Sequence, residues 1–233
     1  ILASSMGFID SSVTSIAMPA MREALGASLS QAQWINAGYL LSLSSLVLVG
    51  GAAGDRFGIA RIFSLGIVIF VAGSLACAFA LTPGLMIAAR VVKGVGAALM
   101  VPGSMAMVSR AYPRAERGRA LGLWAAASTL TTALGPVLGG MFVTWGGELG
   151  WRLIFALNLP LGALTLWLGR KSLPRNPVAS GAPRPAVLDV ALNILMFTLI
   201  FLGGERLGMH GGADSLGAPW AGLALLGAGL AVG

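Results

Sequence analysis

The sequence predicts an all-α transmembrane protein, and its composition and patterning carry that prediction. Of its 233 residues, 57% are hydrophobic and only 10% are charged, with a mean hydropathy of +0.87. A soluble domain carries about a quarter charged residues. The apolar residues form long stretches between short polar segments, and a membrane-spanning helix needs roughly 20 mostly apolar residues. The class is therefore a multispan membrane protein built from helices.

On this rule we predict eight spans, of which the last is shorter than the rule requires. They are 1–21, 32–53, 62–82, 84–108, 119–143, 152–170, 188–208 and 219–233. The sequence starts at Ile1 and ends at Gly233 inside apolar stretches, so we expect a longer chain whose first and last spans are incomplete here. A Pro-, Arg- and Gly-rich stretch, 171–187, is predicted to be a cytoplasmic linker. It separates a six-helix bundle (1–170) from two further helices (188–233), the eighth of them truncated.

Local signals support the boundaries of the spans. Ser30 and Gln33 have the spacing of a capping box and predict the start of the second span. Thr82-Pro83-Gly84 predicts a tight break before the fourth span.

The basic residues predict the orientation. The formal net charge is +7, but the positive residues cluster in short loops, which argues against a nucleic-acid partner. Loops after the second, fourth and sixth spans hold ten of the 15 basic residues, and the other loops hold three. Because cytoplasmic loops carry the excess of Lys and Arg, we predict that the even-numbered loops of the cell (inner) membrane protein are cytoplasmic.

Asp10 is a charged residue inside the first span. An aspartate at the centre of a spanning helix costs about 2.5–3.5 kcal/mol on insertion scales, and such residues face a water-filled cavity or a partner. A carboxylate in this setting suits proton uptake and release. The alternative is a structural role, as an N-cap or in a helix-packing hydrogen bond.

Arg90 and Lys93 lie three residues apart in the fourth span, within one helical turn. Arginine stays protonated when buried, so Arg90 is expected to act on a nearby carboxylate or to attract an anionic group. The alternative is that these side chains snorkel to the membrane surface. We predict a proton- or substrate-coupling site made of Asp10, Arg90 and Lys93.

A polar segment, GDRFGIAR at 54–61, separates the second and third spans. We predict a loop whose glycines permit backbone angles that other residues resist. Asp55 would meet a helix N-terminus while Arg56 and Arg61 pair with acids or lipid phosphates, which makes the loop a gating latch. We expect the helix end that Asp55 contacts to lie outside this chain. The alternative is a positive-inside loop with no further role.

The fifth span carries a stripe of small residues. Thr131, Gly135 and Gly139 recur every fourth residue, with Gly140 beside them, so a neighbouring backbone can approach closely. Pro136 removes a backbone hydrogen bond and is expected to bend the helix. The alternative is ordinary helix packing.

Enzyme chemistry has no support in the sequence. No phosphate-cradling Gly-rich motif is present, His210 is the one histidine and Cys77 the one cysteine. Nothing resembles a Ser-His-Asp or Cys-His arrangement. We therefore predict no ATP-driven motor, no metal site, no cofactor and no enzyme activity.

Together these residues resemble the major facilitator superfamily. The stretch between the second and third spans is similar to that superfamily's loop motif: Gly51-x-x-x-Asp55-Arg56-x-Gly58-x-x-Arg61. The fourth span is similar to its fourth-helix motif: Arg90-x-x-Lys93-Gly94-x-Gly96-Ala97-Ala98. The fifth looks like the motif linked to proton antiporters: Gly135-Pro136-x-x-Gly139-Gly140. The stretches 8–19 and 150–162 look like the 14-helix drug:proton antiporter subfamily.

The resemblance implies two helical bundles that rock around a central cavity, built from repeats of three helices. Asp10 and Arg90 would then face the cavity, and the protein would exchange protons for drugs or other amphipathic small molecules. It would be monomeric in the lipid bilayer. Two of these motifs depart from the family pattern. Lys93 stands where glutamine is frequent, and Ile59-Ala60 replaces a basic residue in the loop motif.

Two other functions stay open. The chain is also compatible with an exporter dedicated to one endogenous metabolite. It is compatible, too, with a membrane sensor or scaffold that keeps the fold without transporting.

Overall fold

The computed structural model describes residues 2–172, 191–192, 194–196 and 198–199. Its elements are α1 (Leu2–Leu25), α2 (Leu29–Phe57), α3 (Ile59–Ala78), α4 (Pro83–Ala111), α5 (Arg117–Trp145), the short 3-10 helix η1 (Gly147–Leu149), α6 (Gly150–Ala156) and α7 (Asn158–Ser172). The predicted linker and most of the two spans after it lie outside the described residues. The boundaries proposed for them stay predictions.

The all-α transmembrane class is confirmed. Within the described residues, five helices are long and apolar enough to cross a membrane: Leu29–Phe57, Ile59–Ala78, Pro83–Ala111, Arg117–Trp145 and Gly150–Arg170. The first predicted span is also a helix, α1, but a more polar one. It carries Asp10 and six serine or threonine residues, and much of its surface is buried among the other helices.

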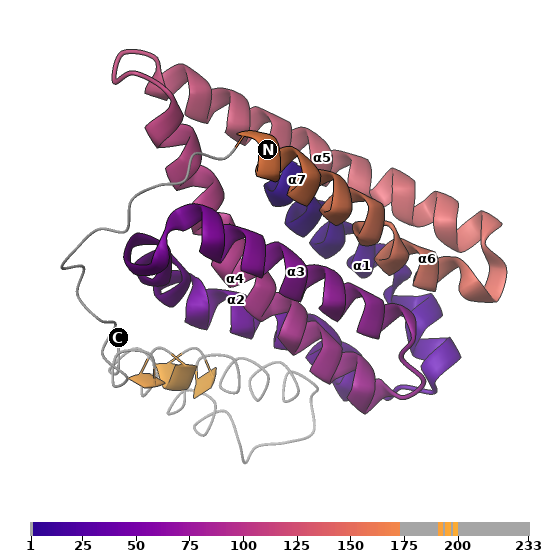
Figure 1. The fold of residues 1–233 in the computed structure, drawn as a ribbon. Helices are drawn as coiled ribbons and strands as arrows, with labels where there is room; N and C mark the ends of the chain where they lie inside the picture. Colours follow the sequence, from indigo (N-terminus) through magenta and orange to yellow (C-terminus); the bar gives the residue numbers. More distant parts are fainter. Residues whose placement is uncertain (1, 173–190, 193, 197, 200–233) are drawn as a thin grey trace, which may run out of the picture.

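The helices run alternately up and down because the connections between them are short (Figure 1). We call the end that carries residues 26–28, 79–82 and 146–149 the odd-loop end. The opposite end, with residue 58 and residues 112–116, is the even-loop end. The predicted capping box is wrong by two positions, since Ser28 caps α2 and exchanges hydrogen bonds with Gln31. The predicted break before α4 is confirmed, and the Thr82 hydroxyl caps that helix.

The predicted loop at 54–61 is wrong. Helix α2 continues through Asp55 and Arg56 to Phe57, and α3 begins at Ile59. A single residue, Gly58, makes the break, with φ of 99°. A residue with a side chain resists this positive φ, so one glycine is sufficient to end one helix and start the next.

The sixth predicted span is interrupted once. Leu157 lies outside both α6 and α7, although its amide still donates to Leu153. Pro160 follows in the first turn of α7. Proline has no amide hydrogen to donate to the carbonyl four residues earlier, which explains why the helical pattern is weakened there.

Helices α2, α3 and α4 pack closely through glycines. A Cβ atom placed on Gly66 of α3 would lie 2.8 Å from the carbonyl oxygen of Gly96 on α4. One placed on Gly94 of α4 would lie 2.5 Å from the carbonyl oxygen of Tyr39 on α2, and one on Gly50 would collide with Ala98. Small residues let spanning helices approach to backbone contact, where dispersion forces are strongest.

A second glycine seam joins α1 to α5, which lie side by side (Figure 1). A Cβ on Gly135 would lie 2.5 Å from the Ser12 side chain, and one on Gly139 would lie 3.2 Å from Val13. The small-residue stripe therefore faces α1, whereas Gly140 faces open space. Helix α5 continues through Pro136 as one helix from Arg117 to Trp145.

Candidate functional site

Asp10 of α1 lies between two cations of α4. Arg90 Nη1 donates to Asp10 Oδ2 at 2.5 Å, and Lys93 Nζ donates to Asp10 Oδ1. The two donors reach the same carboxylate because they are one helical turn apart on α4. We call Asp10, Arg90 and Lys93 the charged cluster.

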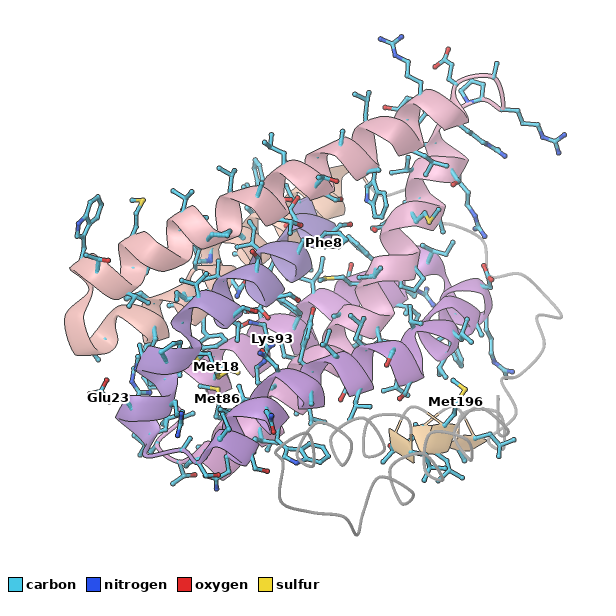
Figure 2. The ribbon with its side chains drawn as sticks, turned by 180° about the vertical axis from the view of Figure 1, so that it is seen from behind. Phe8, Met18, Glu23, Met86, Lys93 and Met196 are labelled. Atoms are coloured by element: carbon cyan, nitrogen blue, oxygen red, sulfur yellow. The ribbon has the colours of Figure 1, made fainter. Side chains whose placement is uncertain are left out.

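The charged cluster is shut off from solvent. The side chains are 0% exposed for Asp10 and Lys93 and 1% for Arg90. Figure 2 shows Lys93 in the middle of the bundle. Snorkelling of these cations is therefore wrong, and so is an N-cap role for Asp10, which lies in mid-helix. In this conformation the cluster is buried within the helices and does not face an open cavity.

Aromatic rings and a carbonyl complete the surroundings of the two cations. Arg90 Nε donates to the carbonyl oxygen of Ile35 at 3.1 Å, and its guanidinium carbon lies 4.4 Å from the Tyr39 ring centre. Lys93 Nζ lies 4.7 Å from the ring centre of Phe70 and 4.8 Å from that of Phe155. These cation–π contacts replace part of the hydration that burial removes. Sequence reasoning missed the three rings, since nothing local marks them as cation partners.

The cluster separates two apolar regions of the core. On α1, Ala3 and Met6 belong to a buried cluster toward the even-loop end. Val13, Ala17 and Met21 belong to another toward the odd-loop end. Charges in such surroundings are stable only when they are paired and hydrogen-bonded.

The charges of the cluster do not cancel. One carboxylate faces two cations, and the side chains give a net charge of one positive unit when all three are ionised. Removing the carboxylate would leave two buried cations without a counter-ion. Breaking a buried ion pair from one side costs about 3–5 kcal/mol.

A hydroxyl network crosses the bundle nearer the even-loop end. The Ser4 and Ser104 hydroxyls lie 2.7 Å apart, and Trp124 Nε1 donates to Ser4 Oγ at 3.1 Å. These residues come from α1, α4 and α5. The Ser12 hydroxyl also donates to the carbonyl oxygen of Thr132 on α5, at 3.0 Å. The sequence offered a signal for this network in the repeated serines of the first span.

The segment expected to be a latch contains an exposed ion pair. Arg110 Nη2, in the last turn of α4, donates to Asp55 Oδ1 at 3.1 Å. The side chains are 54% and 59% exposed for Arg110 and Asp55. Asp55 thus has a side-chain partner within this chain, and the expected contact with a helix end outside it stays a prediction. Arg56 lies over the ring of Phe57 instead, 5.2 Å from its centre.

No candidate metal site appears among the described residues: no three His, Cys, Asp or Glu side chains gather there. Cys77 is buried in the apolar core. The buried side chains of Asp10, Arg90 and Lys93 form ion pairs with one another.

A bundle of long apolar helices with glycine seams and an internal charged cluster defines a multispan membrane protein. The family model of the Major Facilitator Superfamily matches residues 1–233. The chain therefore belongs to this superfamily, and the resemblance stated from its motifs is confirmed.

Several curated relatives are named as resistance or export proteins. The chain is 40% identical over 173 residues to the methylenomycin A resistance protein of Bacillus subtilis, covering 74% of this chain and 36% of the relative. It is 37% identical over 213 residues to a protein of the same name from Streptomyces coelicolor, covering 89% and 43%. It is 36% identical over 209 residues to the probable actinorhodin transporter of Streptomyces coelicolor, covering 86% and 36%. The chain thus spans less than half the length of these relatives.

Solved structures share the fold at low sequence identity. The proton:xylose symporter XylE matches with a TM-score of 0.63 and 18% identity, covering 91% of this chain and 53% of that one. A bacterial homologue of the human lysosomal transporter Spinster matches with a TM-score of 0.62 and 21% identity, covering 89% and 47%. These likenesses establish the fold of a membrane transporter.

Proposed function

We propose that this chain is the N-terminal portion of a proton-coupled secondary transporter that exports drugs or other amphipathic small molecules by alternating access. The observation that carries the proposal is the buried Asp10 carboxylate between Arg90 and Lys93. Protonation of this carboxylate cancels its charge and weakens both ion pairs, which join α1 to α4. A proton thereby changes the relative free energies of two arrangements of these helices, and this is the requirement for coupling.

We also propose how the chain is organised in the membrane. Residues 1–170 form the N-terminal six-helix bundle, 171–187 the linker, and 188–233 further spanning helices. The protein lies in the inner membrane with its even-loop end on the cytoplasmic side. The excess of arginines at this end favours that orientation. The protein acts as a monomer, has no enzyme activity, and its partners are the small-molecule substrate, protons and the bilayer.

We also propose a gating role for the α2–α3 junction (Gly51, Asp55, Arg56, Gly58 and Arg61). The Asp55–Arg110 pair ties the end of α2 to the end of α4 at the even-loop end. The pair is exposed, so it can break and re-form at little cost while the helices move. Gly135, Pro136, Gly139 and Gly140 belong to the helix that supports α1 during this movement.

Flux measurements on the full-length protein in proteoliposomes test the proposal. We expect export to rise with an inward proton gradient and Asp10→Asn to abolish that dependence, because the amide cannot take up the proton. Glu116→Gln is the matched control, since it removes an exposed carboxylate between α4 and α5. Flux that ignores the proton gradient in the unmodified protein would refute antiport, and full coupling in Asp10→Asn would remove Asp10 from the mechanism.

A second candidate is export of a single endogenous metabolite. The names of relatives favour it, since several refer to one antibiotic, such as the tetracenomycin C resistance and export protein of Streptomyces glaucescens. A panel of unrelated amphipathic substrates separates the two functions. Transport of one compound class alone supports the dedicated exporter, and transport of many supports the multidrug exporter. Ligand binding without any flux would instead indicate a sensor.

A further inference from the structure

A pocket of about 570 Å³ opens at the odd-loop end of the bundle. Helix α1 contributes Ala20, Glu23 and Ala24 to its wall, and α6 contributes Trp151 and Arg152. Figure 2 shows Glu23 near the end of α1 and Lys93 deeper in the bundle. The pocket thus lies at one end of the bundle, and the charged cluster lies deeper among the helices (Figure 2).

Two aromatic rings of α6 connect the pocket to the charged cluster. Trp151 lines the pocket and is yet only 1% exposed. Its ring meets that of Phe155 edge to face, with centres 6.4 Å apart and planes at 84°. The face of Phe155 in turn carries Lys93 Nζ at 4.8 Å. These two rings therefore stand between the pocket and the Lys93–Asp10 ion pair.

Arg152 holds Trp151 in this position. Its guanidinium lies 4.2 Å from the centre of the Trp151 ring. Arg152 Nη1 also donates to two carbonyl oxygens, that of Ala78 in the last turn of α3 at 2.6 Å and that of Ala80 in the connection to α4 at 2.8 Å. The indole is consequently clamped against α3 by a cation that is itself anchored. The clamp uses reversible hydrogen bonds at the edge of the pocket.

Two buried polar atoms are unsatisfied in the described part of the chain, one on a residue that lines the pocket and one on a residue a helical turn from Asp10. Trp151 Nε1 and Thr14 Oγ1 have no hydrogen-bond partner among the described residues. Buried polar atoms almost always have one, in protein or in ordered water. Thr14 is one turn beyond Asp10 on the same face of α1, on the way to Ala20 at the pocket. The ten residues from Asp10 to Ala20 span about 15 Å of helix.

We propose that this pocket is the outer entrance of the proton path to Asp10, and that Trp151 is the gate that closes it. When the indole turns away from α3, water enters and hydrogen-bonds to Thr14 Oγ1 and Trp151 Nε1. A hydronium ion in the pocket then gives its proton through this water to a carboxylate oxygen of Asp10. The neutral carboxyl group releases Lys93 and Arg90.

The charged and titratable groups around Asp10 limit how a proton can reach its carboxylate. Arg90 and Lys93 face it from α4, and Tyr39 of α2 and Cys77 of α3 are the further titratable groups that interact with it electrostatically. The cations would oppose the entry of a free proton, and the proposed path therefore reaches the carboxylate through water beside Thr14 on α1. Trp151 is a positioning residue here, because it controls access and takes no proton itself. The inference rests on the proposed antiport.

Proton leak without substrate tests the gate. Full-length protein in proteoliposomes with a trapped pH dye is exposed to an acid step at the odd-loop side. We expect Trp151→Ala to raise the rate of acidification about tenfold or more. Trp151→Phe, which keeps an apolar ring, should leave the leak at the unmodified level. Trp145→Ala is the matched control, because Trp145 of α5 is 77% exposed.

A second readout does not depend on protons. Cys77 is buried in the same apolar cluster as Trp151, so a small membrane-impermeant thiol reagent should reach it slowly. We expect Trp151→Phe with Arg152→Gln, which weakens the clamp but keeps the ring, to speed modification from the odd-loop side about tenfold. Mass spectrometry of the Cys77 peptide measures this even if Trp151→Ala does not fold.

The outcomes separate the two proposals. If the unmodified protein shows proton-coupled flux but neither leak nor Cys77 modification changes in the Trp151 variants, the gate is overturned and antiport stands. If leak and modification both rise while flux ignores the proton gradient, the pocket is an entrance but the antiport proposal fails. A leak that appears equally in Trp145→Ala also overturns the gate.

Discussion

The described residues form ion pairs at two places of opposite character. Asp10 pairs with Arg90 and Lys93 in the interior, where the three side chains are 0–1% exposed. Asp55 pairs with Arg110 at the even-loop end, where both side chains are more than half exposed. Both join helices far apart in the sequence, and in both an aspartate accepts from α4. Their surroundings give them different physical properties.

Burial decides the difference. In the interior, water cannot replace a missing partner. Loss of one ion pair therefore leaves a buried charge unsatisfied unless the helices rearrange. At the surface, water solvates either partner, and an exposed pair contributes only about 0.2–1 kcal/mol. A change of protonation in the buried cluster therefore has a large effect on helix packing, whereas the exposed pair can break and re-form freely.

The largest expected effect is the loss of the buried carboxylate. Asp10→Ala leaves two buried cations unpaired and should lower the free energy of unfolding by about 3–5 kcal/mol. Thermal unfolding of the purified full-length protein in detergent measures this. Asp55→Ala is the control and should cost less than about 1 kcal/mol. Equal losses in the two variants would contradict the contrast.

The glycine seam that holds α1 beside the cluster comes next. Gly135→Ala places a Cβ 2.5 Å from the Ser12 side chain, so α1 has to shift, whereas Gly140→Ala meets open space. Overpacking costs about 1–3 kcal/mol. Unfolding should therefore detect Gly135→Ala and not Gly140→Ala. A neutral Gly135→Ala would show that α1 and α5 do not need this close contact.

The charged cluster predicts a smaller difference, in stability, between variants of its two cations. Lys93→Met leaves one carboxylate with one cation, whereas Arg90→Met also removes the hydrogen bond that Arg90 Nε donates to the Ile35 carbonyl oxygen. A hydrogen bond from a charged group contributes about 1.5–3 kcal/mol. Arg90→Met should thus be the less stable variant by about that amount. The opposite order in thermal unfolding would mean that Lys93 carries the pairing.

The smallest effect belongs to the exposed pair. A double-mutant cycle of Asp55→Asn and Arg110→Gln should give a coupling energy of about 0.2–1 kcal/mol at low salt. It should fade in 1 M salt, where the screening length falls to about 3 Å. The cycle of Asp10 with Arg90, measured in the same way, should keep its value. A salt-independent coupling between Asp55 and Arg110 would indicate a pair shielded from solvent.

Much of the fold was predictable because membrane spans are local. A run of about 20 apolar residues must satisfy its backbone within itself, so each of the six stretches that the structure describes is helical near its predicted place. The exact ends were less predictable. The GDRFG segment looked like a loop because it is polar, but α2 continues through it until Gly58.

The three members of the charged cluster were predicted as one site, but their arrangement was not. Their residue types and positions inside spans marked them as costly and therefore functional. Asp10 and Arg90 are 80 residues apart, and the sequence suggested a cavity where the structure shows a sealed cluster. The pairing of Asp55 with Arg110, 55 residues away, was missed for the same reason.

The sequence by itself determined the class of protein, the approximate spans, the charge bias of the loops and the family. These depend on hydrophobicity, helix length and short motifs, which act within a segment. The tertiary structure alone decided which helices meet at the glycine seams, which cations face Asp10, and which rings close the path to it. Side-chain pairing across helices depends on how α1, α4 and α6 pack, and no single segment contains that information.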